Sequence, residues 1–371
     1  MEEETIKKKR RSSLKQELKS KIIQLMIELG LWKENLQREI PTCWDNFENF
    51  VIFNSRFFKD ESWNKAGSQL WNCISELFSG KSIALQSKIQ NNDFRSPNAH
   101  IVHGDSPWVK YLDNGVRYTW NVEFTMFCTG NVTERHRIGN LNCEGKIIVD
   151  MFAGIGYFVL PYLVHAKAQE VIACEWNPVS LQALKINVVD NKVAEKCVVL
   201  EGDVRVTCPR GIADHINLGL IPSCEQYWSV AAEILKPTGG TLHVHGNVTS
   251  KVQSFTVKCE KCISLLETLK IGTTNLQSKE VKCNGFKIKI SAYNVMTIEI
   301  SEDQIGWKWQ EWFVWSIHVT HSFCMDLYNI TKTEWEVTPI FLHRVKAYAP
   351  HIDHLVLDVS CRNMMLPIKN L

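Results

Sequence analysis

The sequence predicts an α/β fold: a Rossmann-like, doubly wound sheet with an antiparallel C-terminal edge, preceded by a smaller α+β domain. Three observations predict it. A buried-strand run at residues 147–152 leads directly into Gly154-Ile-Gly156. Strand and helix patterns then alternate as far as residue 245, which is typical of a parallel sheet covered by helices on both faces. Two more strand patterns, joined by a turn that contains a proline, occupy residues 345–359.

Residues 1–49 are expected to form a basic arm and a helical segment. An uninterrupted basic run extends from Lys7 to Arg11, and apolar residues follow at helical spacing from Leu18 to Leu29. A solvated arm ahead of an amphipathic helix is the plainer interpretation. Nuclear import and contact with a tRNA backbone stay open as alternatives.

Residues 50–140 are expected to form the smaller α+β domain. The motif Asp113-Asn-Gly115 between two strand patterns indicates a β-hairpin. Cations interleaved with aromatic residues in and beyond this segment match the composition of an RNA-binding surface, although an ordinary solvated face fits them equally well. The residues of this set are Lys110, Arg117, Arg135, Arg137, Lys346, Trp108, Tyr118, Trp120 and Tyr348.

Residues 141–371 are expected to form the main domain. Its helix patterns cover residues 157–166 and 178–191. An apolar stripe of Trp309, Trp312 and Phe313 in a later helical stretch favours packing against the sheet over stacking on bases. The parallel strand patterns cover residues 147–152, 171–175, 197–203, 215–221 and 240–245.

Composition limits the class of protein. A formal net charge of +2 over 371 residues does not by itself indicate nucleic acid, so an RNA surface has to be a local basic patch. The longest apolar runs fall short of the roughly 20 residues that a membrane span needs, and the N-terminal residues lack the apolar stretch of a signal peptide. We therefore expect a cytoplasmic protein with no membrane partner, whose 13 cysteines are reduced thiols. A nuclear pool stays open.

Side chains at the strand ends predict a ligand site. Ligands of doubly wound sheets bind beyond the carboxyl ends of the strands, where the strand order reverses. Asp150, Gly154 and Gly156 follow the first strand, and glycines there let the backbone approach a ligand closely. Glu175 ends the second strand, where an acid can bind both ribose hydroxyls, and Asp203 ends the third, near the position of an adenine.

The spacing favours a nucleoside without phosphates. The dinucleotide fingerprint of NAD proteins has a third glycine where this chain has Val159. Three carboxylates around a glycine turn suit a cationic ligand such as S-adenosylmethionine. An empty or unrelated crevice is the remaining alternative.

Several segments resemble the eukaryotic tRNA wybutosine-synthesising protein 2 family. They are Asp150-Met-Phe-Ala-Gly-Ile-Gly-Tyr-Phe, Cys174-Glu-Trp-Asn-Pro, Asn217-Leu-Gly-Leu-Ile-Pro-Ser, and the segment from Tyr348 to Asp358. Asp113-Asn-Gly-Val-Arg-Tyr and Met126-Phe-Cys-Thr-Gly-Asn-Val-Thr-Glu-Arg resemble it too. The resemblance is weak before residue 108 and between residues 249 and 338. It implies a sheet of the class I methyltransferase type.

The resemblance also implies a reaction. The 3-amino-3-carboxypropyl group of S-adenosylmethionine is expected to pass to a carbon of 4-demethylwyosine, beside the anticodon of phenylalanine tRNA, with release of 5′-methylthioadenosine. This is a step of wybutosine biosynthesis. A tRNA guanine-N1 methyltransferase, and a non-catalytic RNA-binding protein of the same fold, stay open as alternatives.

By the same resemblance, Cys128, Arg135, Glu175, Asp203 and Val204 fall on positions that contact the cofactor. Relatives carry serine at the position of Cys128 and often lysine at that of Arg135. Arginine keeps the charge that can hold the cofactor's carboxylate. The related guanine methyltransferases have a shorter Asn-Leu-Pro or Asn-Pro-Pro motif after the fourth strand, which suggests that the longer motif here presents a different carbon of the cofactor. No catalytic base can be assigned from the sequence.

No metal is expected. Cys259 and Cys262 have a spacing seen in zinc sites, but the nearest later candidate is Cys283 and a structural zinc site needs four ligands. His351, Asp353 and His354 lie in strand and turn patterns, where neighbouring side chains point to opposite faces of a sheet. They are expected to be turn and edge-strand residues.

Overall fold

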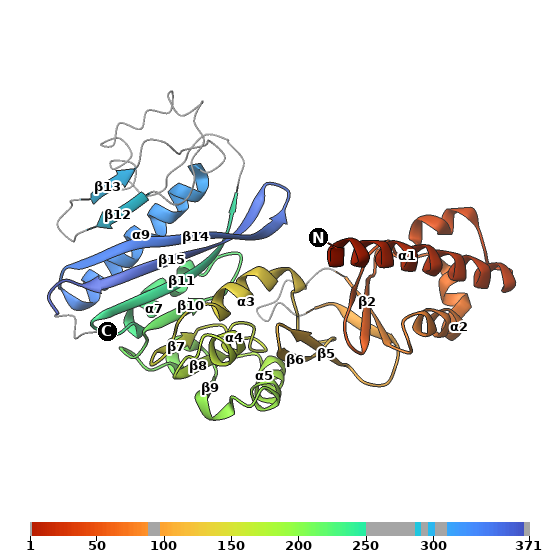
Figure 1. Ribbon diagram of the computed structural model, residues 1–371, viewed down its shortest axis with the longest axis horizontal. Coiled ribbons are helices and arrows are strands. Elements are labelled where there is room, and N and C mark those ends of the chain that lie inside the picture. The colour runs from red at the N-terminus through yellow and green to blue at the C-terminus, as the bar shows by residue number, and fades with distance from the viewer. Residues whose placement is uncertain (1, 88–96, 250–285, 291–295, 301–309, 367–371) are drawn as a thin grey trace, which may run out of the picture. The chain divides into compact units, whose positions relative to one another are not determined.

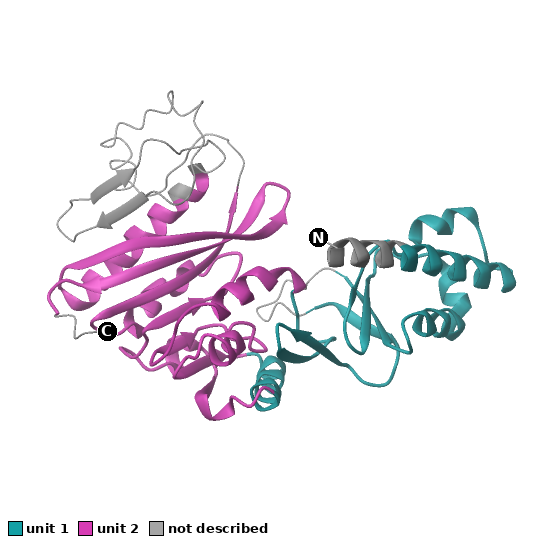
Figure 2. Ribbon diagram, in the orientation of Figure 1, with its two compact units in different colours: residues 1–128, 177–190 teal, residues 129–176, 191–371 magenta. Residues whose placement is uncertain are grey.

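The computed structural model describes residues 2–87, 97–249, 286–290, 296–300 and 310–366. It divides into two compact units, one of residues 1–128 and 177–190, the other of residues 129–176 and 191–371 (Figure 2). None of the described helices combines the length and apolarity needed to cross a lipid bilayer.

These units group the chain differently from the three segments expected from the sequence, 1–49, 50–140 and 141–371. The first helix, α1 (Glu2–Glu28), buries Leu18 and Ile22 in the same apolar core as Val51 and Leu70, so residues 1–49 are not a separate segment. Helix α3 (Val132–Gly139) belongs to the second unit because its side chains bond to a strand there. Long-range contacts of this kind leave no local pattern in the sequence.

The first unit has the α+β character that the sequence predicts. Strands β1 (Trp44–Asn46), β2 (Phe50–Asn54), β3 (Ser82–Gln86) and β4 (Ala99–His103) form one sheet in that order, with β2 and β3 parallel. The other helical elements are η1 (Glu34–Glu39), α2 (Glu61–Leu77) and α5 (Pro178–Asp190). Asn187 of α5 bonds the backbone of Thr119 through both of its side-chain polar atoms, at 2.7 and 3.0 Å.

The predicted β-hairpin is confirmed. Strands β5 (Trp108–Asp113) and β6 (Val116–Asn121) pair antiparallel, from Trp108 opposite Asn121 to Asp113 opposite Val116. Asn114 and Gly115 between them both have positive φ, 49° and 78°. That is the backbone of a tight hairpin turn, which asparagine and glycine adopt more readily than other residues.

The second unit is the predicted doubly wound sheet. Strands β7 (Ile147–Asp150), β8 (Glu170–Glu175), β9 (Cys197–Glu201), β10 (His215–Leu218) and β11 (Gly239–Thr249) are parallel. Their spatial order is β9-β8-β7-β10-β11 (Figure 1). The chain therefore winds outward from β7 in one direction and then returns to continue from β10 in the other. The strand order reverses between β7 and β10, which defines the crevice for a ligand.

The predicted antiparallel strands at the C-terminus are also present. Strand β15 (Ile352–Asn363) pairs antiparallel with β11 on one side and with β14 (Trp335–Ala349) on the other. Two strands that the sequence patterns did not indicate, β12 (Phe286–Ile290) and β13 (Met296–Ile300), continue the sheet beyond β14. Because β15 lies between β11 and β14, His354 is in an interior strand, whereas the sequence pattern had suggested an edge strand.

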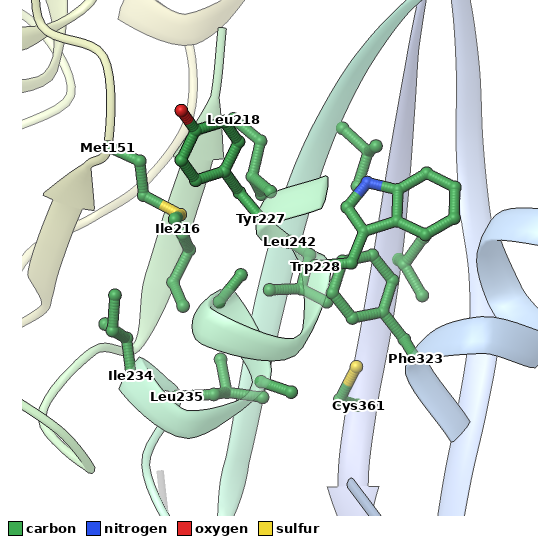
Figure 3. Packing of buried hydrophobic residues seen from close by; sticks show 14 of the residues in the cluster. Met151, Ile216, Leu218, Tyr227, Trp228, Ile234, Leu235, Leu242, Phe323 and Cys361 are labelled. Atoms are coloured by element: carbon green, nitrogen blue, oxygen red, sulfur yellow. The ribbon is translucent and has the colours of Figure 1, made fainter. Parts of the chain in front are cut away.

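The two faces of this sheet differ in chemistry. Helices α7 (Trp228–Ile234) and α9 (Gln310–Thr331) cover an apolar face, where Trp228, Phe323 and Leu242 pack together (Figure 3). Trp312 of α9 is buried against the sheet residues Val248 and Leu355, as predicted for its stripe; Trp309 lies outside the described residues, and so does the side chain of Phe313. The opposite face lies beneath α4 (Val159–Val164) and carries buried histidine and carboxylate side chains.

Candidate functional site

The turn after β7 brings backbone N–H groups to the switch point of the sheet. Gly154 has φ +55° and Gly156 has φ +98°, both in the region that favours glycine. The turn closes on itself through the Gly156 N–H, which donates to the Ala153 carbonyl at 2.9 Å. A Cβ on Gly154 would lie 3.1 Å from the ring of Tyr157. The predicted roles of both glycines as turn residues therefore fit the backbone.

Glu175, the last residue of β8, is tied to this turn. Its Oε2 accepts a hydrogen bond of 2.7 Å from the Gly154 N–H, and its Oε1 accepts one of 2.9 Å from the N–H of Trp176. The carboxylate is only partly buried. The structure thus brings together the acid and the glycine turn, which lie 21 positions apart in the chain.

Asp203 follows β9 and starts the short helix α6 (Val204–Thr207). Its Oδ1 accepts a hydrogen bond of 2.9 Å from the Arg205 N–H, and its carboxylate also forms an ion pair with the Arg205 guanidinium. Hydrogen bonding to Arg205 lowers the pKa of Asp203 below its ordinary value. The side chain of Val204 is buried in the apolar core, so only its backbone can meet a ligand. The partner Arg205 was not identified from the sequence.

Asp150 ends β7 as a fully buried carboxylate. Its Oδ1 accepts hydrogen bonds of 3.2 Å from the Phe152 N–H and from the side-chain amide of Asn217, which lies opposite it at the end of β10. Asp150 Oδ2 and Asn217 Oδ1 are both buried and accept no hydrogen bond from the part of the chain that is described. Burial raises the pKa of Asp150 to about 7, and the charge of Glu175 acts in the same direction.

The segment from Asn217 to Ser223, which we call the β10 wall, is fixed to the neighbouring strand β11. Its Ile221–Pro222 peptide bond is cis, and the Pro222 carbonyl accepts a hydrogen bond of 2.8 Å from the Asn247 N–H. Ser223 also forms a β-bridge with Gly246. Strand β11 therefore holds the wall on the β10 side of the crevice.

Helix α3 carries Arg135 and is anchored to the sheet by its neighbours. Arg137 bonds Glu134 through Nε and Nη2 at 2.8 and 2.7 Å, and bonds Asp358 of β15 at 2.6 and 3.1 Å. Asp358 in turn lies 2.6 Å from His243 Nδ1. All of these side chains are buried or nearly so, and Arg135 is 1% exposed. The network was not predicted, because its members lie up to 221 positions apart in the chain.

Part of the RNA-binding surface that the sequence suggested is buried in the structure, so the prediction is wrong for those residues. Tyr118 and Trp120 are 1% and 2% exposed and belong to the interior of the first unit. Arg135 and Arg137 are also buried, Arg137 between the carboxylates of Glu134 and Asp358. Their alternation with aromatic residues reflects packing of a hairpin and a helix, which composition alone does not distinguish from a binding face.

Cys128 is the one predicted contact residue that belongs to the first unit. It is partly buried and is the last residue of that unit before α3. The other predicted contact residues are all in the second unit.

Within the described residues, no three histidine, cysteine or acidic side chains gather as metal ligands do. Cys259, Cys262 and Cys283 lie outside those residues. His351 is in the turn before β15 with φ +61°, as predicted. Asp353 bonds Arg344 at 2.9 Å, whereas His354 bonds His245 at 3.0 Å, so the two do not converge on one ion.

Comparison with known proteins shows which family this chain is similar to. The model of the TRM5/TYW2 methyltransferase domain matches residues 110–269. The tRNA wybutosine-synthesizing protein 2 homolog of Danio rerio is 37% identical over 332 residues, which are 89% of this chain and 74% of the relative. The tRNA wybutosine-synthesizing protein 2/3/4 of Arabidopsis thaliana is 36% identical over 94% of this chain, but the chain spans only 29% of the length of that relative.

A solved structure shares the fold. The crystal structure of Pyrococcus horikoshii TYW2 in complex with MeSAdo superposes with a TM-score of 0.61 at 20% sequence identity, over 93% of this chain and 99% of that one. At this identity the likeness concerns the fold, and it agrees with the doubly wound strand order. With the zebrafish relative matched over most of both chains, the protein belongs to the tRNA wybutosine-synthesizing protein 2 family.

Proposed function

We propose that this protein is an S-adenosylmethionine-dependent tRNA aminocarboxypropyltransferase of wybutosine biosynthesis. It transfers the 3-amino-3-carboxypropyl group to 4-demethylwyosine in phenylalanine tRNA and releases 5′-methylthioadenosine. The observation that carries the proposal is 37% identity to a wybutosine-synthesizing protein 2 homolog over 89% of the chain, with the glycine turn and strand-end acids in one crevice.

The residues at the switch point fit S-adenosylmethionine. Asp150 Oδ2 and Asn217 Oδ1 are buried acceptors that take no hydrogen bond from the described residues, and a ligand ammonium supplies the donors that they lack. Three carboxylates at successive strand ends also favour a ligand with a sulfonium charge. When bound, the cofactor supplies an electrophilic carbon next to a positively charged sulfur.

Each predicted contact then has a role that its position allows. Glu175 binds the ribose hydroxyls from the end of β8 while it holds the Gly154 turn, and Gly156 keeps the turn free of a side chain. Asp203 and the backbone of Val204 face the adenine. Arg135 on α3 is a cation for the carboxylate of the aminocarboxypropyl group. The contact of Cys128 stays a prediction from the family resemblance.

The β10 wall selects which carbon reacts. The sulfonium has three electrophilic carbons, and displacement takes place at the one held in line with the nucleophile. The wall is fixed to β11 through Pro222 and Ser223, so it forms a stiff boundary of the crevice. A longer wall than that of the guanine methyltransferases turns the aminocarboxypropyl arm toward the tRNA base.

The by-product tests this function. The purified protein is incubated with S-adenosylmethionine and phenylalanine tRNA bearing 4-demethylwyosine, and the nucleoside released is identified by mass spectrometry. We expect 5′-methylthioadenosine in proportion to modified tRNA. S-adenosylhomocysteine would make the protein a methyltransferase, and tRNA binding without either product would make it a non-catalytic RNA-binding protein.

A variant of the wall tests the origin of selectivity. Replacing residues 217–223 with Asn-Leu-Pro is expected to lower the ratio of 5′-methylthioadenosine to S-adenosylhomocysteine in the same assay. A matched control is Val206→Ala in α6, an exposed residue that belongs to neither the wall nor the turn. An unchanged ratio in a wall variant that still binds S-adenosylmethionine would contradict the role of the wall.

A further inference from the structure

Two buried histidines lie at the carboxyl edge of the sheet, next to the β10 wall. The last residue pair between β10 and β11 is Leu218 opposite Val244, so His245 is the first residue of β11 beyond the end of β10. Its backbone carbonyl accepts a hydrogen bond from Cys224, and its ring lies 5.1 Å from that of Phe158, between centroids. A Cβ on Gly219 of the wall would lie 3.4 Å from the ring of the same Phe158.

The hydrogen bonds of His245 leave one ring nitrogen for a ligand. Its Nδ1 lies 3.0 Å from Nε2 of His354 on β15, and both residues are 1% exposed. Within the described residues, His245 Nε2 and His354 Nδ1 have no hydrogen-bond partner. A buried polar atom without a partner is costly, so it points to a ligand or water that the protein holds there.

The pair is built to pass a proton. One ring donates to the other across the 3.0 Å contact, so one outer nitrogen bears a hydrogen and the other a lone pair. If a proton arrives at His245 Nε2, His245 can pass its Nδ1 hydrogen to His354 Nε2. His354 then releases its Nδ1 hydrogen to a water molecule, because Lys346, its neighbour on β14, is an ammonium that cannot accept a proton.

Both rings are neutral at pH 7. Burial, together with the nearby Lys346 and His343, lowers the pKa of His354 to about 4. Burial also lowers the pKa of His245, as do His354, Arg137 and His243, while Asp358 acts in the opposite direction. The lone pair that a proton acceptor needs is therefore present.

We propose that His245 accepts the proton that the tRNA base loses during aminocarboxypropyl transfer, and that His354 relays it. This inference rests on the proposed function. The acceptor carbon of the base forms a bond to the γ-carbon of the aminocarboxypropyl group, the γ-carbon–sulfur bond breaks, and sulfur keeps the electron pair. The positive charge passes to the base, whose proton at that carbon moves to His245 Nε2 and restores the ring. The sulfonium becomes a neutral thioether and one proton is released from the base, so charge is balanced and the step needs no oxidant or reductant.

The test compares His245→Gln and His354→Gln with His215→Gln in the full-length protein. His215 is a matched control, because it makes the same kind of contact, 3.1 Å from His243, but at the first residue of β10 and thus away from the carboxyl edge. Transfer is measured with tRNA whose acceptor carbon bears hydrogen or deuterium. Affinity for S-adenosylmethionine and the thermal midpoint are measured for each variant.

We expect both variants of the pair to lower kcat by at least about 100-fold, the lower end of what acid–base catalysis contributes. Their KM values should change little. Because loss of the proton then limits the rate, a primary deuterium isotope effect should appear in His245→Gln and be absent in His215→Gln.

Other outcomes overturn the proposal separately from the function. If wild-type protein releases 5′-methylthioadenosine but His245→Gln keeps wild-type kcat, or loses kcat without an isotope effect, the relay is wrong and the function stands. If both variants of the pair lose their fold or their affinity for S-adenosylmethionine, the pair is structural. If the wild-type protein forms no 5′-methylthioadenosine, the proposed function itself fails.

Discussion

Replacing Arg137 with methionine should be among the most destabilising changes on the polar face of the sheet. Arg137 separates the carboxylates of Glu134, whose side chain is 0% exposed, and Asp358, at 6%, and bonds each of them twice. Methionine fills most of the volume but leaves both carboxylates buried without their cation. Breaking a buried pair by removing one partner costs about 3–5 kcal/mol.

The matched control is Arg344→Met. Arg344 also bonds a carboxylate twice, at 2.9 and 2.7 Å from Asp353, but its side chain is 49% exposed. Solvent screens such a pair, so its loss should cost about 0–1 kcal/mol. The free energy of unfolding is measured by urea denaturation at low and high salt. Equal losses in the two variants would refute the argument that desolvation decides the cost.

The pH dependence gives a second test of the same variant. Burial acts to raise the pKa of Asp358, but His243 and Arg137 more than offset it and hold that pKa well below its ordinary value of 3.8. A depressed pKa contributes stability that is present above the ordinary value and is lost as the pH falls below it. Without Arg137 the pKa of Asp358 should rise, so the difference between wild type and variant should shrink below about pH 4.

Three further predictions concern the crevice. Gly154→Ala should weaken S-adenosylmethionine binding measured by calorimetry by at least about 10-fold, a loss of ~1.4 kcal/mol, because its Cβ would lie 3.1 Å from the ring of Tyr157 and displace the turn that Glu175 holds. Gly145→Ala carries the same kind of backbone strain at positive φ, but its Cβ meets no neighbour, so it should leave binding unchanged. Affinity for S-adenosylmethionine should rise between about pH 6 and 8, the range in which Asp150 ionises. This rise should vanish in Asp150→Asn but survive in Asp203→Asn, whose carboxyl has a lowered pKa. The stability of the apo-protein relative to Asp150→Asn should fall as the pH rises from about 4 through 7, since the pKa of Asp150 is raised. Urea-denaturation free energies that change equally with pH in the two proteins would contradict this assignment.

Local patterns predicted the parts of the fold that local sequence determines. The β7 run, the glycine turn and the acids at the strand ends each depend on a few neighbouring residues, and Glu175 does bond Gly154 at the carboxyl edge of the sheet. The alternation of strands and helices then indicated the parallel sheet. The hairpin at Asn114 came from the same kind of short-range rule.

Features that depend on distant partners could not be predicted in this way. Arginine is a residue type that RNA-binding surfaces use, and only the bonds of Arg137 to Asp358, 221 positions away, place it in the interior. His354 was expected in an edge strand, but β14, β12 and β13 extend the sheet on one side of it. The boundary between the two units differs from the expected one for the same reason, since Arg137 of α3 bonds Asp358 of β15.

The polar face of the sheet indicates where function resides within this fold. Around Arg137, the buried charges of Glu134 and Asp358 are met by hydrogen bonds, as a structural network requires. At the carboxyl edge, Asp150, Asn217 and His245 each keep a buried polar atom that no described residue satisfies. Such an atom costs about 1–3 kcal/mol, so stability alone would favour apolar side chains there. A ligand or a bound water that supplies the missing bonds offsets this cost, which supports the proposed site between the glycine turn and the β10 wall.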